Sequence, residues 1–465
     1  GFGPDLNAYT SFDETVYKLR LPTTDAETVE KGYLILSDWA SEITASDEAL
    51  EAERGVIIEE WRGRRGARAR IRDEQFPVMF PGSRYAKRLP IGTLEVLKNF
   101  EFERLRDYYR DWYRPELMSV IAVGDLDVDA TRAKIEKYFS AIESPEDPPK
   151  RIQYTHPPHE KTQVGTFSDP ELTSSELTLM WKMPPMPIRT ERDYRRAVKA
   201  SLVTDMLNVR LAELSQASDA PFLRGGAYRG GYTRGGDVFL LYAGVKDREG
   251  AYTEAAEALL AETFRAKRHG FTKAELERVK ARQLRGLEKR VKERESTESA
   301  AHAREAIRHA LTGEFMPGIE RELELHREVF PDVGTGELQE FLRSWITDEN
   351  RVIMAEGPSR DGETRLPTEA ALLAGYDEVA SRTLEPYTEA DLERPLVEQA
   401  PEPGTVVSKE VREDLGLHFW TLSNGVRVIL KPTAFKQDQI LLNAWSPGGY
   451  NRYDAERALQ ARVAS

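Results

Sequence analysis

Residues 46–61 read Ser46-Asp47-Glu48-Ala49-Leu50-Glu51-Ala52-Glu53-Arg54-Gly55-Val56-Ile57-Ile58-Glu59-Glu60-Trp61, and this stretch predicts one amphipathic helix. At about 100° per residue, Leu50 and Ile57 fall along one line of the helix and mark an arc that we expect to be buried. Glu53 and Glu60 lie inside the same arc, about two turns apart. Two acids therefore stand on the face that should pack against the rest of the protein.

These two acids need a partner, because an ionised carboxylate on an apolar face is costly unless it is paired, hydrogen-bonded or bound to a metal. One explanation is a structural salt bridge to a nearby arginine. The other is a metal-ligand or catalytic role. Glu59 points almost opposite to Glu60 and is expected to face solvent.

The composition limits the class of protein. With 465 residues, of which 40% are apolar and 31% charged, the chain is typical of globular proteins of about two to four domains. The net charge of −13 argues against nucleic-acid binding, which needs a basic surface. Residues 61–72 hold six arginines without alternating aromatic residues, which favours a solvated continuation of the helix. No apolar run approaches the ~20 residues of a membrane helix.

Cysteine is absent, which removes disulfides, thiol nucleophiles and cysteine-type zinc sites, and fits an oxidising compartment. The sequence opens on Gly1 without a methionine or a visible signal peptide, so we expect a fragment of a longer protein. His156-Pro157-Pro158-His159 spaces two histidines as a metal site could. Its prolines disfavour the helix that would bring both rings to one ion, so we expect no metal there.

An internal repeat is visible in the apolar positions. At an offset of 233 residues, the matched positions join Leu105, Tyr108, Trp112, Glu116, Val120, Ala122 and Gly124 to Leu338, Phe341, Trp345, Glu349, Ile353, Ala355 and Gly357. At an offset of 226, residues 46–60 overlay residues 272–286 and keep their apolar skeleton.

The two acids are not repeated. Glu53 and Glu60 face Val279 and Gly286 in the second copy. Structural acids would be expected to persist alongside the packing residues, so this loss favours a functional role for the pair. The first copy alone is then equipped for chemistry.

The repeat predicts an α+β fold with tandem homologous domains, each an antiparallel-rich sheet with helices on one face, plus the start of a third. The expected divisions are a first domain over 1–150, a second non-catalytic domain over 160–385, a linker over 386–410, and the start of a third domain over 411–465. Predicted helices include 26–40, 101–113, 128–142, 194–214 and 251–268, and predicted strands include 15–21, 119–123, 177–183 and 440–445. Asn424-Gly425 predicts a hairpin turn.

Four stretches resemble the pitrilysin/insulinase family of zinc peptidases, and bacterial envelope-associated members most closely. They are the runs at 7–17 (beginning Asn7-Ala8-Tyr9-Thr10), at 53–61 (Glu53 to Trp61), at 112–116 (Trp112-Tyr113-Arg114-Pro115-Glu116) and at 422–426 (Leu422-Ser423-Asn424-Gly425-Val426). They span the whole chain in the family's order. Members of that family have two halves of two homologous domains each, which close like a clam around a peptide.

The resemblance implies roles for particular residues. In the family, zinc is held by two histidines of a His-x-x-Glu-His helix and by a later glutamate, which Glu60 resembles. Glu53 resembles the family's supporting carboxylate, so we count it with the catalytic residues. Asn7, Ala8 and Tyr9 match a strand edge to which relatives add the peptide substrate. No His-x-x-Glu-His is present, and in relatives it lies a few tens of residues before the Asn7-Ala8-Tyr9 stretch.

Two functions remain open at this point. The first is a zinc-dependent endopeptidase of peptides or small unfolded proteins, seen here as a fragment that is inactive alone and works with the C-terminal half of the same protein. The second is a non-catalytic family member that serves as a scaffold or substrate-binding subunit. The resemblance implies Zn²⁺ in the intact protein, a periplasmic or cell-envelope location, and neither nucleic acid nor a membrane span as a partner.

Overall fold

The computed structural model describes residues 6–22, 25–360, 362–388, 397, 399–437, 439–449, 452–454, 457, 458 and 460. The chain forms two compact units, one of residues 1–287 and 297–391 and one of residues 288–296 and 392–465. Residues 389–396 and 398 of the expected linker lie outside the described residues. The finer division of the larger unit into two domains remains a prediction.

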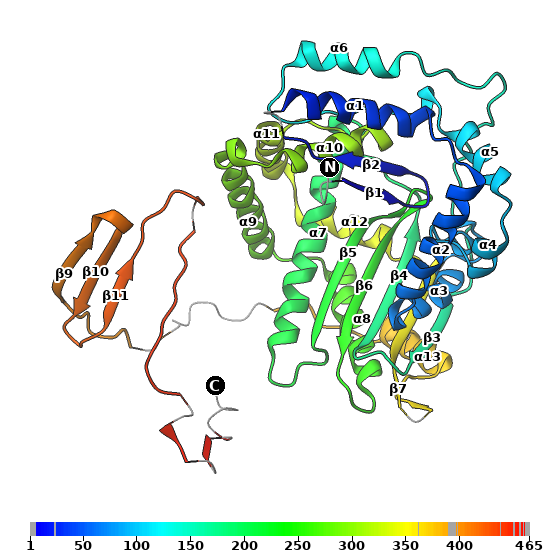
Figure 1. The fold of residues 1–465 in the computed structure, drawn as a ribbon. Coiled ribbons are helices and arrows are strands. Elements are labelled where there is room, and N and C mark those ends of the chain that lie inside the picture. The colour runs from blue at the N-terminus through cyan, green and yellow to red at the C-terminus, as the bar shows by residue number, and fades with distance from the viewer. Residues whose placement is uncertain are drawn as a thin grey trace. The chain divides into compact units, whose positions relative to one another are not determined.

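The larger unit begins with a two-stranded hairpin followed by helices (Figure 1). β1 (Leu6–Thr10) pairs antiparallel with β2 (Thr15–Leu19). The helices after it are α1 (Ala26–Ser41), α2 (Asp47–Gly63), α3 (Ala67–Met79), α4 (Leu94–Asn99), α5 (Phe102–Trp112) and α6 (Val128–Phe139). Ser46 begins α2 as its N-cap, since its hydroxyl accepts a hydrogen bond from the backbone N–H of Ala49 at 3.2 Å.

A larger sheet organises the rest of this unit. Its strands are β3 (Gln163–Asp169), β4 (Ser175–Met183), β5 (Arg224–Thr233), β6 (Gly236–Val245), β7 (Arg351–Arg360) and the short β8 (Glu363–Thr364). They lie in the order β3-β7-β4-β6-β5, with β8 on β7, and only the β3–β7 pair of these is parallel. The helices are α7 (Glu191–Gln216), α8 (Ala251–His269), α9 (Lys273–Lys292), α10 (Ser299–Thr312), α11 (Ile319–Val329), α12 (Thr335–Trp345) and α13 (Glu369–Ser381).

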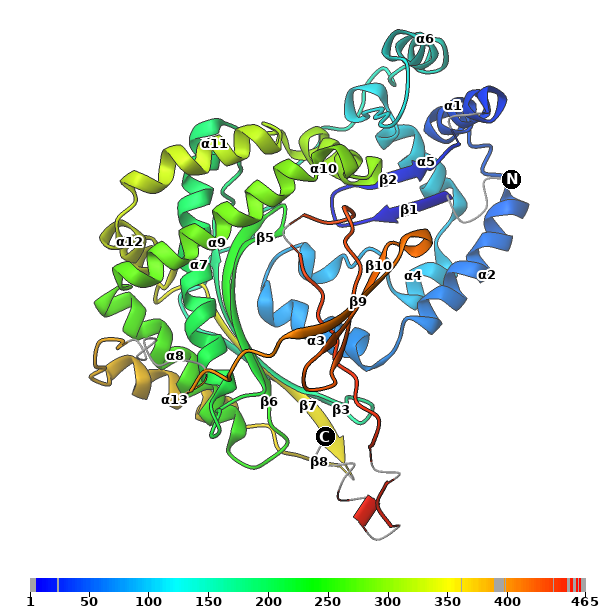
Figure 2. The ribbon, with the colours of Figure 1, turned by 90° about the vertical axis from the view of Figure 1, so that its left-hand side faces the viewer.

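Two apolar cores lie on opposite faces of this sheet. On β4, Leu177 and Trp181 point to one face and pack with residues of α7, α8, α12 and α13. Met180 points to the other face and packs with Ile71 and Phe80, which belong to or follow α3. Figure 2 shows α7 and α8 on one side of the sheet and α3 on the other. The helices of the second copy thus cover one face, and a helix of the first copy covers the opposite face.

The order of elements repeats along the chain. The first copy runs β1, β2, α1, α2 and later α5 and α6, and the second runs β5, β6, α8, α9 and later α12 and α13. At the offset of 233, α5 (Phe102–Trp112) falls on α12 (Thr335–Trp345) from end to end. The second copy opens with β3, β4 and α7, which have no counterpart among the described elements of the first.

Residues 119–123 were predicted to form a strand, but they join no strand ladder in the described chain. At the matched positions of the second copy, β7 is held between β3 and β4. A strand is stabilised by hydrogen bonds to its neighbours, and the described first copy holds no counterpart of either neighbour. The prediction is therefore wrong for this structure.

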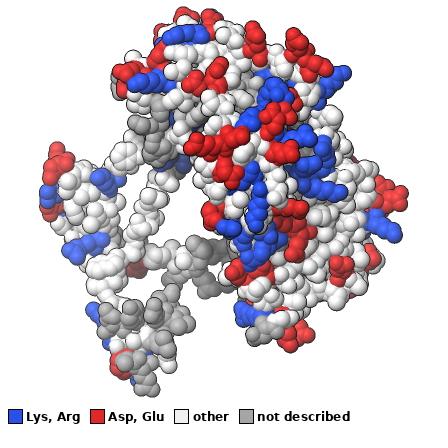
Figure 3. All heavy atoms as spheres, turned by 45° about the vertical axis from the view of Figure 1, so that its right-hand side comes forward, with Lys and Arg blue, Asp and Glu red and all other residues white. Residues whose placement is uncertain are grey.

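The arginine-rich segment was expected to be solvated, and this expectation is wrong for Arg70, whose side chain is 33% exposed, whereas the Arg68 side chain stays 63% exposed. Arg70 in α3 binds Asp169 with two hydrogen bonds, of 2.7 and 2.8 Å. Arg68 lies 3.4 Å from Glu356 and also donates to Ser174 at 2.9 Å. These side chains fasten α3 to the sheet. Basic and acidic side chains are interspersed over the face seen in Figure 3.

The smaller unit contains a three-stranded antiparallel sheet of β9 (Val406–Arg412), β10 (Leu417–Leu422) and β11 (Arg427–Leu430). The predicted turn at Asn424-Gly425 joins β10 to β11, with Gly425 at a φ of 81° that favours glycine. Residues 440–445 form no strand, and Ile440 and Trp445 are more than four-fifths exposed. That strand prediction is also wrong, because no described neighbour pairs with the segment.

Candidate functional site

The two acids of α2 lie on a surface that is less buried than the sequence predicts. No residue of α2 is fully buried, and Val56 on the flank of the predicted arc is 58% exposed. Glu53 is exposed, and Glu60 is partly exposed and pairs with Arg64 at 2.5 Å. Glu59 is exposed, as predicted. The buried arc is therefore a wrong prediction for this structure.

The second copy gives the physical reason. There, α9 matches α2, and the positions of Leu50 and Glu53 are taken by Leu276 and Val279, which are 3% and 2% exposed. α9 is covered on this side by α7, to which Gln283 donates a 2.8 Å hydrogen bond at Asp205. No described helix takes the place of α7 in the first copy. The acid-bearing face of α2 thus lacks the layer that covers its counterpart.

Arg54 fixes the neighbouring face of α2. Its guanidinium donates to the carbonyl oxygens of Leu97 and Phe100 at 2.7 and 3.1 Å, and it lies over the ring of Phe100 at 4.4 Å. α2 is thereby held to α4 and to the segment that follows it. Sequence reasoning did not single out Arg54, although it stands beside Glu53.

The β1–β2 hairpin carries Asn7, Ala8 and Tyr9 on its first strand, and all five residues of β1 are exposed. At the turn, the N–H of Ser11 donates to the carbonyl of Glu14 at 2.9 Å. Because hydrogen-bonded and non-bonded pairs alternate in an antiparallel ladder, the pairs of Asn7 and Tyr9 exchange hydrogen bonds with β2. The N–H and C=O of Ala8 therefore point away from β2. Ala8 offers both groups at an edge that no described strand covers.

The corresponding edge strand of the second copy is closed. The side chain of Asn208 in α7 donates to the carbonyl of Ala227 at 3.0 Å and accepts from its N–H at 2.7 Å. The hydroxyl of Tyr228 donates to the carbonyl of Gly231 at 3.1 Å. Outward groups of β5 are thus satisfied by side chains, whereas the Ala8 groups of β1 are not.

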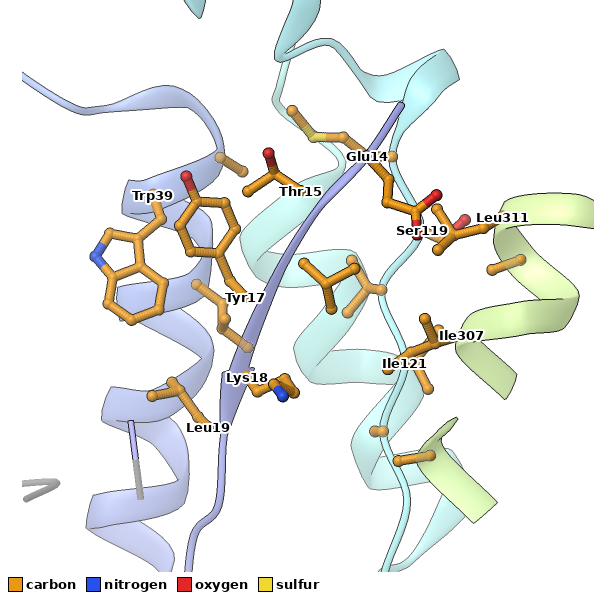
Figure 4. Close-up of a pocket in the computed structure, with 18 of the residues that line it drawn as sticks. Glu14, Thr15, Tyr17, Lys18, Leu19, Trp39, Ser119, Ile121, Ile307 and Leu311 are labelled. Atoms are coloured by element: carbon orange, nitrogen blue, oxygen red, sulfur yellow. The ribbon is translucent and has the colours of Figure 1, made fainter. Parts of the chain in front are cut away.

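A cavity of about 2350 Å³ lies next to the hairpin, between β2, α1, residues 117–127 and α10. Figure 4 shows Ile307 and Leu311 of α10 facing Ile121 and Ser119, with side chains of β2 and Trp39 on the opposite side. The wall formed by residues 119–123 is the segment without a ladder. One side of the cavity is therefore unpaired backbone, and much of the rest is apolar.

Tyrosine hydroxyls supply polar groups at one end of this cavity. The hydroxyls of Tyr17 and Tyr113 are 2.6 Å apart, and burial raises the pKa of Tyr113 well above its ordinary value. Tyr113 therefore stays protonated at neutral pH. Both residues lie in stretches that the sequence singled out, at 7–17 and 112–116, but their contact was not predicted because they are 96 positions apart.

The residues offer an incomplete set of metal ligands. Among the described residues, no group of three or more His, Asp or Glu side chains is placed to hold a metal ion. Glu60 has the donor chemistry of the carboxylate that joins two histidines in many catalytic zinc sites. The chain thus fits one ligand position of such a site.

His156 and His159 lie in the connector that follows the first copy, and their rings bond different partners. His156 Nε2 bonds the hydroxyl of Thr233 at 2.6 Å, and His159 Nδ1 bonds the carbonyl of Lys161 at 2.7 Å. Within the described part of the chain, no helix has the length and apolar character needed to cross a bilayer.

Comparison with known proteins gives the family. The family described as "Peptidase M16 inactive domain" matches residues 99–283. The "Zinc protease PQQL-like" protein of Arabidopsis thaliana is 30% identical over 96% of this chain and 44% of its own length. "Probable zinc protease PqqL" of Escherichia coli is 27% identical over 98% of this chain and 49% of its own length. The chain thus spans about half the length of these relatives.

The fold agrees with this relationship. The crystal structure of the periplasmic protease PqqL from Escherichia coli has a TM-score of 0.78 at 26% identity, over 94% of this chain and 48% of that chain. The structure of the first half of the same protease has a TM-score of 0.76. Its α+β fold and its similarity to these tandem-domain zinc proteases place the chain in the pitrilysin/insulinase (M16) family of peptidases.

Proposed function

We propose that this chain is the zinc-site half of a metalloendopeptidase, in which Glu60 is a zinc ligand and Glu53 orients the site. The observation that carries the proposal is the contrast between the two copies of the fold. On α9 the positions of Leu50 and Glu53 are buried under α7, whereas α2 exposes its acids on the matching face. A helix equivalent to α7 would cover Glu53 and Glu60 and bring its own side chains to them.

The chemistry of the two acids supports these roles. Zinc bound by two histidines and a glutamate lowers the pKa of a bound water and polarises a peptide carbonyl. Glu60 would supply the carboxylate ligand, and its pairing with Arg64 on the surface leaves it available for exchange. Glu53, two turns earlier on the same face, would hold a neighbouring ligand in orientation. The remaining ligands would come from another segment of the intact protein.

The open edge of β1 supports a peptide as the substrate. Ala8 presents an outward N–H and C=O between Asn7 and Tyr9, and an extended peptide can bond to both groups. Main-chain pairing accepts many sequences, so selectivity would rest on side pockets and on the size of the chamber. The substrates that we propose are peptides or small unfolded proteins. They would be enclosed between this chain and the C-terminal half of the same protein.

We further propose the domain division 1–150, 160–385, 386–410 and 411–465, with the second domain serving for packing. A relative of this chain is described as a periplasmic protease, which supports a periplasmic or cell-envelope location.

A second candidate is a non-catalytic scaffold or substrate-binding subunit. It is favoured by the description of the matched family as an inactive domain. Zinc content and peptide cleavage of the intact protein distinguish the two. One zinc per protein together with chelator-sensitive cleavage supports the peptidase, and a metal-free intact protein that binds peptides without cleaving them supports the scaffold.

A further inference from the structure

Three buried nitrogen atoms lie where the connector after the first copy crosses the large sheet. They are Nδ1 of His156, Nε2 of His159 and Nζ of Lys182, and none of the three has a hydrogen-bond partner among the described residues. Lys182 is only 6% exposed. A buried ammonium group without a partner is costly and calls for a compensating group.

Lys182 and His156 both lie against the ring of Phe80. Lys182 is the penultimate residue of β4 and lies opposite Val238 of β6, on the sheet face that packs against α3. Its Nζ lies 5.8 Å from the centre of the Phe80 ring, and the His156 ring stacks on the same ring at 4.2 Å. The ammonium and the imidazole thus border one aromatic side chain.

Asn350 ties the second histidine to the same strand. Its backbone accepts from the N–H of Lys182 at 3.0 Å and donates to the carbonyl of His159 at 2.9 Å, while its side chain accepts from the N–H of His159 at 2.9 Å. These bonds hold Asn350 at a φ of 59°, in the left-handed region that asparagine tolerates. The connector is thereby fastened directly beside Lys182.

The turn between β5 and β6 is shaped to admit His156. A Cβ on Gly236 would lie 2.8 Å from the imidazole Cδ2 and 2.9 Å from the carbonyl of Met183, so glycine is required for this close approach. The ring is therefore held rigidly, with its Nδ1 buried.

Within the described part of the chain, no carboxylate bonds the Nζ of Lys182. Burial lowers the pKa of Lys182 to about 8, and burial together with the Lys182 charge lowers the pKa of His156 to about 4. Two acids of neighbouring segments are engaged elsewhere. Asp237 pairs with Arg229 at 3.1 Å, and Asp13 accepts from the hydroxyl of Tyr85 at 3.0 Å.

The hydrogen-bond chemistry selects the sign of the ligand. The Lys182 ammonium has three N–H donors, and His156 can donate from Nδ1 while its Nε2 accepts from Thr233. His159 donates from Nδ1 to the carbonyl of Lys161, and burial together with the Lys182 charge lowers the pKa of its ring, so its Nε2 is an acceptor and adds no donor. The ammonium disfavours a metal cation at the same place.

We propose that Lys182 and His156 form a binding site for one small inorganic anion, of the size of chloride, which fastens the connector between the two copies to the sheet. The anion would accept from the ammonium and from Nδ1 of His156. This site is independent of the zinc site proposed above and involves none of its residues.

The test uses chloride and bromide as probes on the whole 465-residue chain. Thermal unfolding is followed while chloride replaces gluconate at constant ionic strength, for the wild type and for Lys182→Met. We expect the wild-type Tm to rise with chloride and to saturate, and we expect the saturable part to be absent in the variant. Lys199→Met, which removes a partly exposed lysine that pairs with Glu337, is the matched control and should retain the wild-type response.

Crystals grown in bromide supply an independent measurement. An anomalous peak within hydrogen-bond distance of Lys182 Nζ is expected. A site that holds water alone in bromide overturns the proposal, as does an equal saturable response in Lys182→Met. If that variant fails to fold, the bromide peak still decides the matter.

Discussion

The carboxylate of Glu60 lies 2.5 Å from the guanidinium of Arg64, one turn further along α2. The two side chains are 39% and 72% exposed, and a pair of this kind is worth roughly 0–1 kcal/mol, so a metal ion can replace it. In the intact protein, Glu60→Gln is expected to lower zinc content and kcat/KM by at least tenfold. Metal analysis and peptide cleavage measure both quantities.

Glu59→Gln is the matched control for this substitution. Glu59 is exposed and pairs with Arg62 on the outside of the helix, so its amide variant should keep wild-type zinc content and activity. Equal zinc content in wild type and Glu60→Gln would refute the assignment of the ligand.

The 465-residue chain by itself is expected to retain no zinc after dialysis and to cleave no peptide. Catalytic zinc sites take three protein ligands, and the described residues supply no cluster of that size. A chelator-sensitive activity of the purified chain that returns with added zinc would show that the site is placed wrongly.

Ala8→Pro removes the backbone N–H of Ala8, which lies in the middle of β1 and points away from β2. In the intact protein this variant should raise the KM for peptides several-fold while zinc content stays unchanged. Ala8→Ser keeps the N–H and is expected to behave as wild type. Wild-type kinetics in a folded, zinc-loaded Ala8→Pro protein would exclude peptide addition at this edge.

His156 predicts a stability change in mild acid. Its folded-state pKa is about 4, below the ordinary value of 6.5, so the unfolded chain binds more protons between these values. Stability contributed by the neutral ring is therefore present above pH 6.5 and lost as the pH falls towards 4. We expect a loss on the order of 1–2 kcal/mol, allowing for the partly exposed ring. Urea unfolding at several pH values should show a flatter profile for His156→Gln.

Arg210 is the most deeply buried cation of the described second copy and pairs with both Glu262 and Glu275, at 3.0 and 2.6 Å. Arg210→Ala removes the buried cation shared by two carboxylates, of which Glu262 keeps its pair with Arg265, and is expected to lower the free energy of unfolding by about 3–5 kcal/mol. Arg195→Ala, on the same helix but partly exposed, should lower it by less than about 1 kcal/mol. Similar losses for the two variants in denaturant unfolding would contradict this account.

Local elements were predictable from the sequence where the decisive information is local. The period of apolar residues placed α1, α2, α5, α6, α7 and α8 within a few residues of their observed ends. Asn424-Gly425 placed its turn, because few other pairs accept the backbone that a tight hairpin requires. The correspondence between α5 and α12 was predictable from the sequence repeat at an offset of 233 residues.

Features that depend on distant partners were not predictable. Arg70 binds Asp169, 99 positions away, and Arg68 reaches Glu356, 288 positions away, so neither contact leaves a local pattern. Residues 119–123 have the composition of a strand, yet a strand exists only beside a neighbour. The prediction of a buried arc on α2 was wrong for the same reason. Whether a helix face is buried depends on the element that packs over it, and that element is distant in the sequence. The roles of Glu60, Glu53, Asn7, Ala8 and Tyr9 stay predictions.

The amide of Asn208 occupies the two polar groups of Ala227 at the outer edge of β5. An uncovered edge of a glycine-rich strand is a template on which further chains can stack and seed fibrils. The Asn208 amide bonds both the N–H and the C=O of Ala227, as a residue of a neighbouring strand would. A further strand therefore cannot pair with β5 at Ala227. The edge that stays open at Ala8 in the first copy is therefore closed at Ala227 in the second, so a further strand could pair at the first position and not at the second.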